Sequence, residues 1–288
     1  MTVRRMILCM VLIVATPLWA EAGFSRTEIE LIANKLDGAD IPSEFVYRTL
    51  SDERLEKLDI VVSRNVFNQE SQRDYESFTN GYSMHVANRF YKKWHSKLTQ
   101  ASQRFQVDPH VIVAILLVET AFGQFPGQFP VISVYASMVL AYEELRLEQQ
   151  ERGLSPPLSE QDAYFEKRLK TKANWAMEEL RSILLMGSLK NIDILNLKGS
   201  YAGAFGVPQF IPSSYLSWGY DGNHDGHVDL FQIPDAIYSV ANYLSEHGWK
   251  GTELTRAENY EAVLGYNYSR IYADTVIQVA GKLKKKTL

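Results

Sequence analysis

The sequence predicts a mainly α-helical protein, and three observations support this fold class. Apolar residues recur at spacings of three and four along much of the chain, most clearly over residues 75–105, as on the buried side of amphipathic helices. Asp108 followed by Pro109 is a strong helix start, because Asp caps helix N-termini and Pro suits the first helical position. The alternating patterns typical of strands are few and short.

Other helix signals lie on both sides of this start. Residues 25–28, Ser-Arg-Thr-Glu, precede an amphipathic run at 29–36, and residues 51–55 look like a second helix start. Residues 111–118 are almost wholly apolar. We therefore expect the helix that contains them to be buried on most sides and to end near Gly123.

The second half of the chain alternates helices with polar loops. A charge-rich segment at 143–172 is predicted to form a helix, a break at 153–157 and a second helix. A loop rich in Gly, Pro and Ser covers residues 198–214, and an acidic, Gly-rich loop covers residues 221–229. Further helices are expected at 173–186, at 233–247 and at the end of the chain.

The composition is that of an ordinary globular protein. The 288 residues are 46% hydrophobic and 22% charged, with a formal net charge of −4, and such a chain can bury a sizeable core. No densely basic face is expected, so nucleic acid is not expected as a partner. The 16 tyrosines offer flat rings with polar tips, which suit carbohydrate and equally suit the edges of helical cores.

The first 22 residues are typical of a secretory signal peptide. Arg4 and Arg5 precede an apolar run of 13 residues, and residues 20–22 form a small-x-small cleavage site. A membrane-spanning helix needs about 20 apolar residues, so cleavage is favoured over a retained anchor. Cys9, the only cysteine, lies in the run without the small residues that precede a lipoprotein cysteine. We predict an exported protein that is not a lipoprotein and whose mature form lacks disulfides.

Glu119 is the one charged residue in the helix that starts after Asp108. A carboxyl at the end of an apolar helix is expected to be poorly solvated, which disfavours its charged form and raises its pKa. A general acid that works at neutral pH requires this property. A Glu that pairs with a buried Arg or caps a loop is the alternative that this segment leaves open.

Two loops also carry candidate functional residues. Residues 200–214 are rich in small side chains that let backbone approach a ligand closely, and Gln209 offers both a donor and an acceptor. A tight turn between helices would explain this loop equally well.

The acidic loop fits the start of an EF-hand. Asp221, Asn223 and Asp225 stand at the oxygen-ligand positions 1, 3 and 5, with Gly at position 6 and an apolar residue at position 8. His227 would contribute its backbone carbonyl. Position 12 is Gln232, a poor substitute for a bidentate carboxylate. We predict a structural Ca²⁺ site of modest affinity, and a turn without metal is the alternative.

Five blocks, in order across residues 105–272, resemble the membrane-bound lytic murein transglycosylase B family. The first is Glu-Thr-x-x-Gly, which starts at Glu119, and the second is the Ser-x-Ala-Gly-Ala-x-Gly-x-x-Gln-Phe-x-Pro-Ser-Ser loop. The acidic loop, Asp-Ala-Ile-x-Ser-Val-Ala-Asn-Tyr at 235–243 and Tyr-Asn-x-Ser-x-x-Tyr at 266–272 complete the set. The first hundred residues match only loosely.

The resemblance implies a lysozyme-like helical core and a division of the chain. It implies that Asp235 closes the metal loop as the last ligand. The expected units are a signal peptide at 1–22, a helical domain at 23–99 joined by 273–288, a catalytic core at 100–212 continued by 236–272, and a small subdomain with the calcium loop at 213–235.

The resemblance also implies cleavage of the bond between N-acetylmuramic acid and N-acetylglucosamine. Glu119 would protonate the leaving glycosidic oxygen, and the N-acetyl group of the substrate would stabilise the oxocarbenium-like centre. The ionised Glu119 would then take the proton of the muramic C6 hydroxyl, which closes a 1,6-anhydro ring. A second carboxylate, which most glycosidases need, would not be required.

The resemblance assigns further residues to the cleft. Ser200 and Gln209 would lie beside the acid, and three tyrosines would shape the floor and orient the acid, although core packing is an alternative for each of them. These tyrosines are Tyr243, Tyr266 and Tyr272.

One departure concerns the glycan contacts. Where the family has two adjacent arginines and a tyrosine, this chain has Thr171, Lys172 and Trp175. Thr171 cannot supply a bidentate guanidinium contact and Lys172 is only a point charge, whereas Trp175 could stack on a sugar. The polar segment at 143–170 is also longer than in relatives. Substrate preference along the strand or its stem peptide is therefore open.

The sequence thus predicts a monomeric, periplasmic lytic transglycosylase that acts on peptidoglycan glycan strands, with other cell-wall enzymes as further partners. A hydrolytic muramidase is the enzymatic alternative, since the same residues would serve it. A non-catalytic peptidoglycan-binding or scaffold protein and a calcium sensor are the alternatives from other classes.

Overall fold

The computed structural model describes residues 23–36, 40–67, 75–151, 160–190 and 192–287. The predicted signal peptide and the predicted break at 153–157 lie outside the described residues. Within the described part, the predicted mainly helical fold is confirmed, because β1 (Phe129–Pro130) and β2 (Lys198–Gly199) form just one short antiparallel pair. None of the described helices is both long and apolar enough to span a bilayer.

The helices follow the chain in an order close to the predicted one. They are α1 (Arg26–Lys35), α2 (Ser43–Leu50), α3 (Asp59–Phe67), the 3-10 helix η1 (Glu76–Thr79), α5 (Gly81–Lys93), α6 (His95–Phe105), α7 (Pro109–Thr120), α8 (Val131–Glu151), α9 (Glu160–Lys190), α10 (Pro212–Trp218), α11 (Ile233–Glu246), α12 (Ala257–Tyr266) and α13 (Arg270–Thr287).

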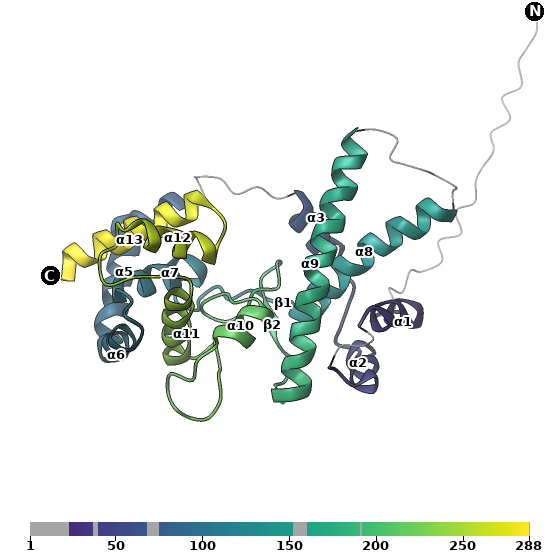
Figure 1. The fold of residues 1–288 in the computed structure, drawn as a ribbon, viewed down its shortest axis with the longest axis horizontal. Helices are drawn as coiled ribbons and strands as arrows, with labels where there is room; N and C mark the ends of the chain where they lie inside the picture. The colour runs from purple at the N-terminus through teal and green to yellow at the C-terminus, as the bar shows by residue number, and fades with distance from the viewer. Residues whose placement is uncertain (1–22, 37–39, 68–74, 152–159, 191, 288) are drawn as a thin grey trace, which may run out of the picture.

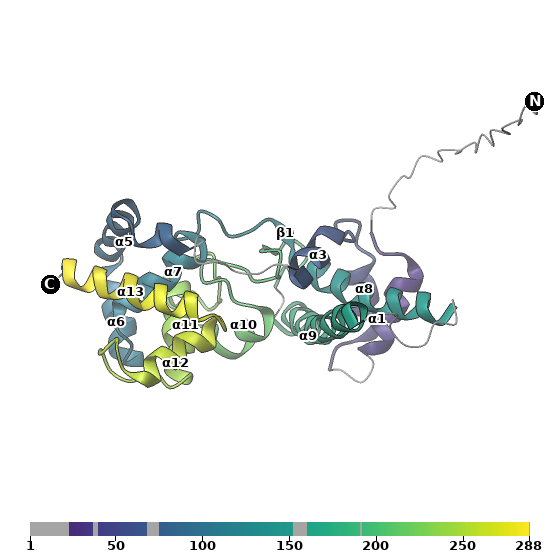
Figure 2. The same ribbon diagram turned by 90° about the horizontal axis from the view of Figure 1, so that it is seen from above.

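The helices pack in two groups along the long axis of the molecule (Figures 1 and 2). One group contains α1, α2, α3, α8 and α9, and the other contains α5, α6, α7, α11, α12 and α13. The short helix α10 contacts both α9 and α11 and so bridges the groups. A single buried hydrophobic cluster runs through both. The helices between residues 23 and 99, predicted as one domain, are shared between the groups.

Helix α7 is the centre of the second group. Residues 111–118 are all buried, in agreement with the apolar run in the sequence, and α5, α6, α11 and α13 pack around them. Asp108 caps the helix as predicted, with its side chain accepting a hydrogen bond from the backbone N–H of His110, and Pro109 stands at the first helical position.

The predicted helix start at 51–55 is wrong. The carboxylate of Asp52 accepts hydrogen bonds from the backbone N–H and the guanidinium of Arg54, which turns the chain. Two of the next backbone N–H groups donate to the hydroxyls of Ser133 (3.1 Å) and Ser137 (2.8 Å) on α8. Because these serines replace the carbonyls of a helix as acceptors, α3 begins later, at Asp59.

The two helices predicted around residue 172 are one helix. Helix α9 runs for 31 residues without interruption, and its sequence contains no Gly or Pro before Gly187. Because no residue breaks the backbone pattern, the change from a polar to an apolar surface at Ala173 marks where α9 becomes buried against its neighbours and not where a new helix starts.

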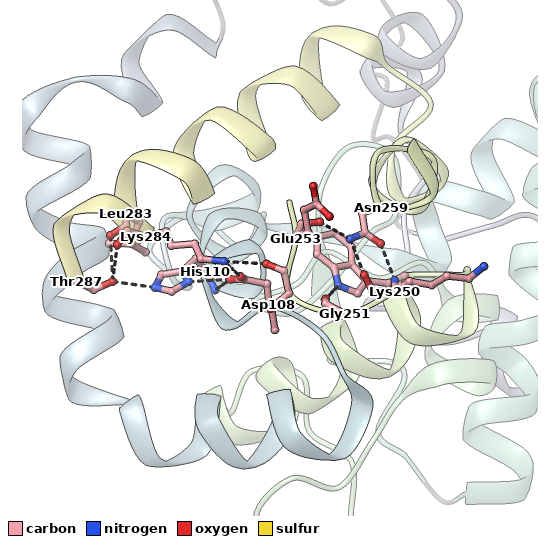
Figure 3. Close-up of polar contacts among 11 residues, drawn as sticks. Asp108, His110, Lys250, Gly251, Glu253, Asn259, Leu283, Lys284 and Thr287 are labelled. Atoms are coloured by element: carbon pink, nitrogen blue, oxygen red, sulfur yellow. Dashed lines mark hydrogen bonds and ion pairs between the residues drawn. The ribbon is translucent and has the colours of Figure 1, made fainter. Parts of the chain in front are cut away.

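A buried polar network ties the start of α7 to the last turn of α13 (Figure 3). The carboxylate of Asp108 contacts the ring of His110 at 2.7 Å and accepts a hydrogen bond from Nζ of Lys284 at 2.8 Å. The other ring nitrogen of His110 lies 2.9 Å from the hydroxyl of Thr287. Burial alone would raise the pKa of Asp108, but the hydrogen bonds from His110 and Lys284 outweigh it and hold the pKa below its usual value.

Replacing Asp108 with Asn keeps a cap but removes the charge that Lys284 contacts. We expect the free energy of unfolding near neutral pH to fall by about 2 kcal/mol, the usual contribution of hydrogen bonds to a charged group. Because the folded pKa of Asp108 lies below its unfolded value, this stabilisation is complete above about pH 4 and is lost as the pH falls through the folded pKa.

Denaturant unfolding of both proteins across the acid range would measure this difference. The control is Asp52→Asn, which removes an ion pair whose Arg54 side chain is 46% exposed, so a smaller loss is expected. A stability difference for Asp108→Asn that does not shrink at acid pH would contradict the assignment.

Candidate active site

Glu119 lies in the last turn of α7, half-buried, and contacts α13. Its Oε1 accepts a hydrogen bond of 2.6 Å from the hydroxyl of Tyr272, a length typical of bonds to a charged acceptor. Burial, and then the negative charge of Glu119, raise the pKa of Tyr272 well above its usual value. The phenol therefore stays protonated and remains a hydrogen-bond donor to the carboxylate.

The chain leaves α7 through three residues with positive φ. They are Ala121 (φ 50°), Phe122 (φ 63°) and Gly123 (φ 89°), and Gly alone adopts this conformation without a steric cost. The ring of Phe122 stacks on Phe90 of α5 with centroids 4.0 Å apart, which holds the turn. The helix ends at Thr120, three residues before the Gly123 that was predicted to mark its end.

Thr120 joins this turn to the loop that carries Gln209. Its hydroxyl donates to the carbonyl of Val207 (2.8 Å) and accepts from the N–H of Gly123 (2.9 Å). Nearby, Gly127 packs so closely that a Cβ there would stand 2.1 Å from the backbone of Gly199 and 2.4 Å from that of Ser200. The loop with Ser200 and Gln209 is therefore held at the carboxyl end of α7, beside Glu119.

Gln209 is fixed by its own amide. Both hydrogens of its Nε2 donate to backbone carbonyls, of Pro126 (3.1 Å) and Gly206 (3.0 Å). Since both partners are acceptors, the orientation of the amide is settled, and Oε1 is the atom left for a further partner. The sequence suggested that Gln209 offers a ligand both a donor and an acceptor. In the structure the donor hydrogens are used by backbone carbonyls, and the acceptor Oε1 is available to a ligand.

The three tyrosines form one aromatic cluster but have different hydroxyl partners. The rings of Tyr266 and Tyr272 stack at 6.4 Å, and Tyr243 meets Tyr266 edge-on at 4.8 Å. The hydroxyl of Tyr266 donates to the carbonyl of Pro208 (2.6 Å), and that of Tyr243 donates to the carbonyl of Gly265 (2.7 Å). Tyr272 therefore bonds the carboxylate, whereas the other two hydroxyls bond backbone.

Tyr75 was missed by the sequence analysis as a site residue. Its ring meets Tyr272 edge-on at 6.3 Å, so Tyr75 contacts the tyrosine that donates a hydrogen bond to Glu119. In the sequence it stood only at the start of an amphipathic run, and no spacing signal distinguishes it from a core aromatic residue.

Trp175 and Lys172 lie on α9, in the other group of helices. The ammonium of Lys172 stands 5.1 Å from the centre of the Trp175 ring, and burial, followed by the charge of Arg168, lowers the pKa of Lys172. Trp175 packs edge-on against Tyr135 at 5.6 Å, and Tyr135 fills the space where Gly203 would carry a side chain. These two predicted residues are thus linked to the Ser200–Gln209 loop through Tyr135.

The acidic loop is closed by hydrogen bonds to its own backbone. The carboxylate of Asp221 accepts from three N–H groups, at residues 224, 225 and 226. Both oxygens of the buried Asp235 also accept backbone N–H groups. Oxygen donors of this kind suit Ca²⁺, but within the described part of the chain no three His, Cys, Asp or Glu side chains are gathered as a metal site. The oxygen donors of the loop are therefore of the type that calcium binds, but the carboxylate of Asp235 is already bonded to backbone N–H groups.

Comparison with known proteins places the chain in a family. The family model described as Transglycosylase SLT domain matches residues 21–258. Membrane-bound lytic murein transglycosylase B of Escherichia coli (strain K12) is 32% identical over 201 residues, which are 69% of this chain and 48% of that protein. The chain therefore spans about half the length of this curated relative.

Solved structures share the fold. Soluble lytic transglycosylase SltB1 from Pseudomonas aeruginosa superposes with a TM-score of 0.72 at 22% identity, covering 91% of this chain and 99% of that chain. Slt35 of Escherichia coli in complex with calcium gives 0.70 at 22% identity, over 90% and 93%. SltB3 from Pseudomonas aeruginosa in complex with NAG-anhNAM-pentapeptide gives 0.71 at 18% identity, over 90% and 79%.

These similarities confirm the predicted mainly helical, lysozyme-like fold. The family model covers far more than half of the residues and includes Glu119, the Ser200–Gln209 loop and the acidic loop. The resemblance found in the sequence is thereby confirmed: the chain belongs to the Transglycosylase SLT domain family.

Proposed function

We propose that this protein is an exported lytic transglycosylase that cleaves peptidoglycan glycan strands in the periplasm. The observation that carries the proposal is the 2.6 Å hydrogen bond from Tyr272 to Glu119 at the end of a buried apolar helix. It supplies one oriented carboxyl beside the Ser200–Gln209 loop, as a reaction with a single acid and base requires.

In this reaction Glu119 first transfers its proton to the glycosidic oxygen, and the C1–O bond breaks. The carboxylate that forms keeps its hydrogen bond from Tyr272, which stabilises the negative charge. The same carboxylate then accepts the proton of the muramic C6 hydroxyl, whose oxygen bonds to C1. The proton count balances without water, and Glu119 ends the cycle protonated, ready for the next bond.

The substrate class follows from family membership and the solved relatives. SltB3 has been observed with a NAG-anhNAM-pentapeptide, which is an anhydro sugar of the kind that this reaction produces. Lys172 and Trp175 are proposed to contact the glycan from α9, and the Oε1 of Gln209 to accept a hydrogen bond from it. A muramidase that admits water would use the same residues and would leave a reducing end.

The acidic loop is proposed to bind Ca²⁺ as a structural ion within a subdomain at 213–235. The side chains of Asp221, Asn223 and Asp225 and the carbonyl of His227 would supply oxygen ligands. Asp235 would join them only if its backbone hydrogen bonds were exchanged for the ion. The support is the chemistry of the donors and the calcium in the structure of the similar Slt35.

Replacing Glu119 with Gln should abolish glycan cleavage and preserve folding, because the amide keeps the shape but cannot donate a proton to a leaving group. Digestion of purified sacculi followed by mass spectrometry measures both rate and product. The wild-type product should be lighter by one water than a hydrolytic product. Wild-type turnover in the variant would refute the proposed acid, and reducing ends in the wild-type digest would favour the muramidase.

Replacing Tyr272 with Phe should lower turnover by about tenfold to a hundredfold, since one hydrogen bond to a charged group contributes about 1.5–3 kcal/mol. The matched control is Tyr266→Phe, whose hydroxyl bonds the carbonyl of Pro208. Tyr266→Phe is expected to lower the melting temperature more than it lowers turnover. Equal losses of turnover in both variants, measured on sacculi, would argue against a specific role for Tyr272.

Calcium should bind the wild-type chain and raise its melting temperature, whereas Asp221→Asn and Asp225→Asn should weaken both effects. Isothermal titration and thermal melts with and without the ion provide the measurements. Absence of binding heat together with an unchanged melting temperature would remove the calcium proposal and would leave the role of Glu119 untouched.

A further inference from the structure

Two segments that lie at one end of the molecule carry many cations and no acidic residue. Residues 77–107 contain five Lys and Arg and residues 275–288 contain four, so the two segments hold nine of the chain's 30 Lys and Arg and none of its 34 Asp and Glu. Protein surfaces usually intersperse both signs, and the whole chain has a net charge of −4. The charge is therefore strongly asymmetric.

On α5 these cations form an exposed stripe. Met84, Ala87 and Phe90 are buried on one side of the helix. The opposite side exposes Tyr82, which is 76% accessible, and the cations that follow it at helical spacing. The exposed cations of this stripe are Arg89, Lys92 and Lys93.

A second stripe runs along α13 and meets the first. Lys282, Lys285 and Lys286 are exposed on α13, and Nζ of Lys282 donates to the carbonyl of Thr79 just before α5 (3.1 Å). The two helices pack against each other.

The carboxyl ends of both helices converge on His110. The ring of Tyr91 in α5 stacks on the His110 ring at 4.8 Å, and Thr287 in α13 lies 2.9 Å from its other side (Figure 3). We call Arg89, Lys92, Lys93, Lys282, Lys285 and Lys286 the basic face.

The cations of the basic face are not paired with carboxylates of the described residues. Among the described residues none of its six members takes part in an ion pair. Lysines in the last turn of a helix are stabilised by the helix dipole. The dipole explains the four last-turn lysines of the face, but not Arg89 or Lys282 and not the lack of acids in the two segments. The sequence analysis expected no densely basic face, and that expectation is wrong because the fold joins two distant segments.

We propose that the basic face docks this protein on the surface of a bilayer that contains anionic phospholipid. Lys and Arg near such a surface are attracted by its negative potential. Tyr82 and Trp94 flank the cations, with Nζ of Lys93 5.4 Å from the Trp94 ring, and Tyr and Trp beside Lys and Arg are typical of groups at the headgroup level.

The position of the basic face would leave the candidate active site uncovered. Figures 1 and 2 show α5 and α13 at the end of the molecule opposite α8 and α9. Phe90, on the buried side of α5, stacks on Phe122, three residues after Glu119, so the exposed stripe of α5 faces away from the turn that contains Phe122. A docked protein could therefore still receive a glycan strand.

Co-sedimentation with vesicles tests this proposal. The full mature chain is mixed with vesicles of phosphatidylcholine alone, or of phosphatidylcholine with phosphatidylglycerol. Preferential binding to the second kind is expected, with release at high salt, because the Debye length falls from about 10 Å at 0.1 M to about 3 Å at 1 M. Equal partition into both kinds, or binding insensitive to salt, would overturn the proposal.

Matched charge reversals locate the binding surface. Lys92→Glu with Lys93→Glu should reduce binding to the anionic vesicles by about tenfold or more. Lys167→Glu with Lys170→Glu changes the net charge equally on exposed positions of α9 and should bind like the wild type. Similar losses in both double variants would show an effect of net charge alone and would overturn the basic face as the docking surface. Circular dichroism checks that both variants fold.

Two further measurements separate this inference from the proposed function. Glu119→Gln should bind anionic vesicles like the wild type, so docking can be confirmed even if glycan cleavage is not. Poly-glutamate and single-stranded DNA serve as polyanions without a bilayer. Binding to either of them at least as tight as to the anionic vesicles, and lost in Lys92→Glu with Lys93→Glu, would assign the face to a different partner and reject the lipid surface.

Discussion

The pairing of α7 with α13 is the interaction on which the candidate site depends. The two helices lie antiparallel and are tied at both ends, by Lys284 to Asp108 at 2.8 Å and by Tyr272 to Glu119 at 2.6 Å. A shift of one helix along the other would leave both carboxylates without these partners, and unpaired buried charges are costly. The register of the pair therefore determines where the proposed acid stands.

This pairing also holds the proposed acid in place. Glu119 follows eight buried residues of α7 and is itself half-buried, and its Oε1 accepts the hydrogen bond of the Tyr272 hydroxyl. In the proposed reaction this bond stabilises the carboxylate that forms when Glu119 gives up its proton. The same bond keeps the carboxylate oriented for the proton that it must accept in the second step.

The sequence predicted those parts of the fold and site that depend on local patterns. The Asp108 cap, the buried run of α7 and the block around Gln209 all have short-range signals. The turn at Asp52 depends on hydroxyls of α8 some eighty residues away, and the use of the Gln209 amide depends on a carbonyl at Pro126. Contacts between distant segments leave no such local signal: nothing in a single sequence pairs Tyr75 with Tyr272, and the two acid-free basic segments are visible there but not their meeting in one face.

The proposed site residues come from both groups of helices, and the close packing where the groups meet requires a glycine. Gly203 has φ of 81°, and a side chain there would stand 2.3 Å from the ring of Tyr135. Tyr135 is fully buried on α8 and packs on Trp175 of α9, so the loop can approach this group only where no Cβ intervenes. The small residues of this loop therefore serve the fit between the groups as well as access for a ligand. Since the proposed acid lies on one group and Lys172 and Trp175 on the other, this fit sets the distance between the proposed chemistry and the proposed glycan contacts.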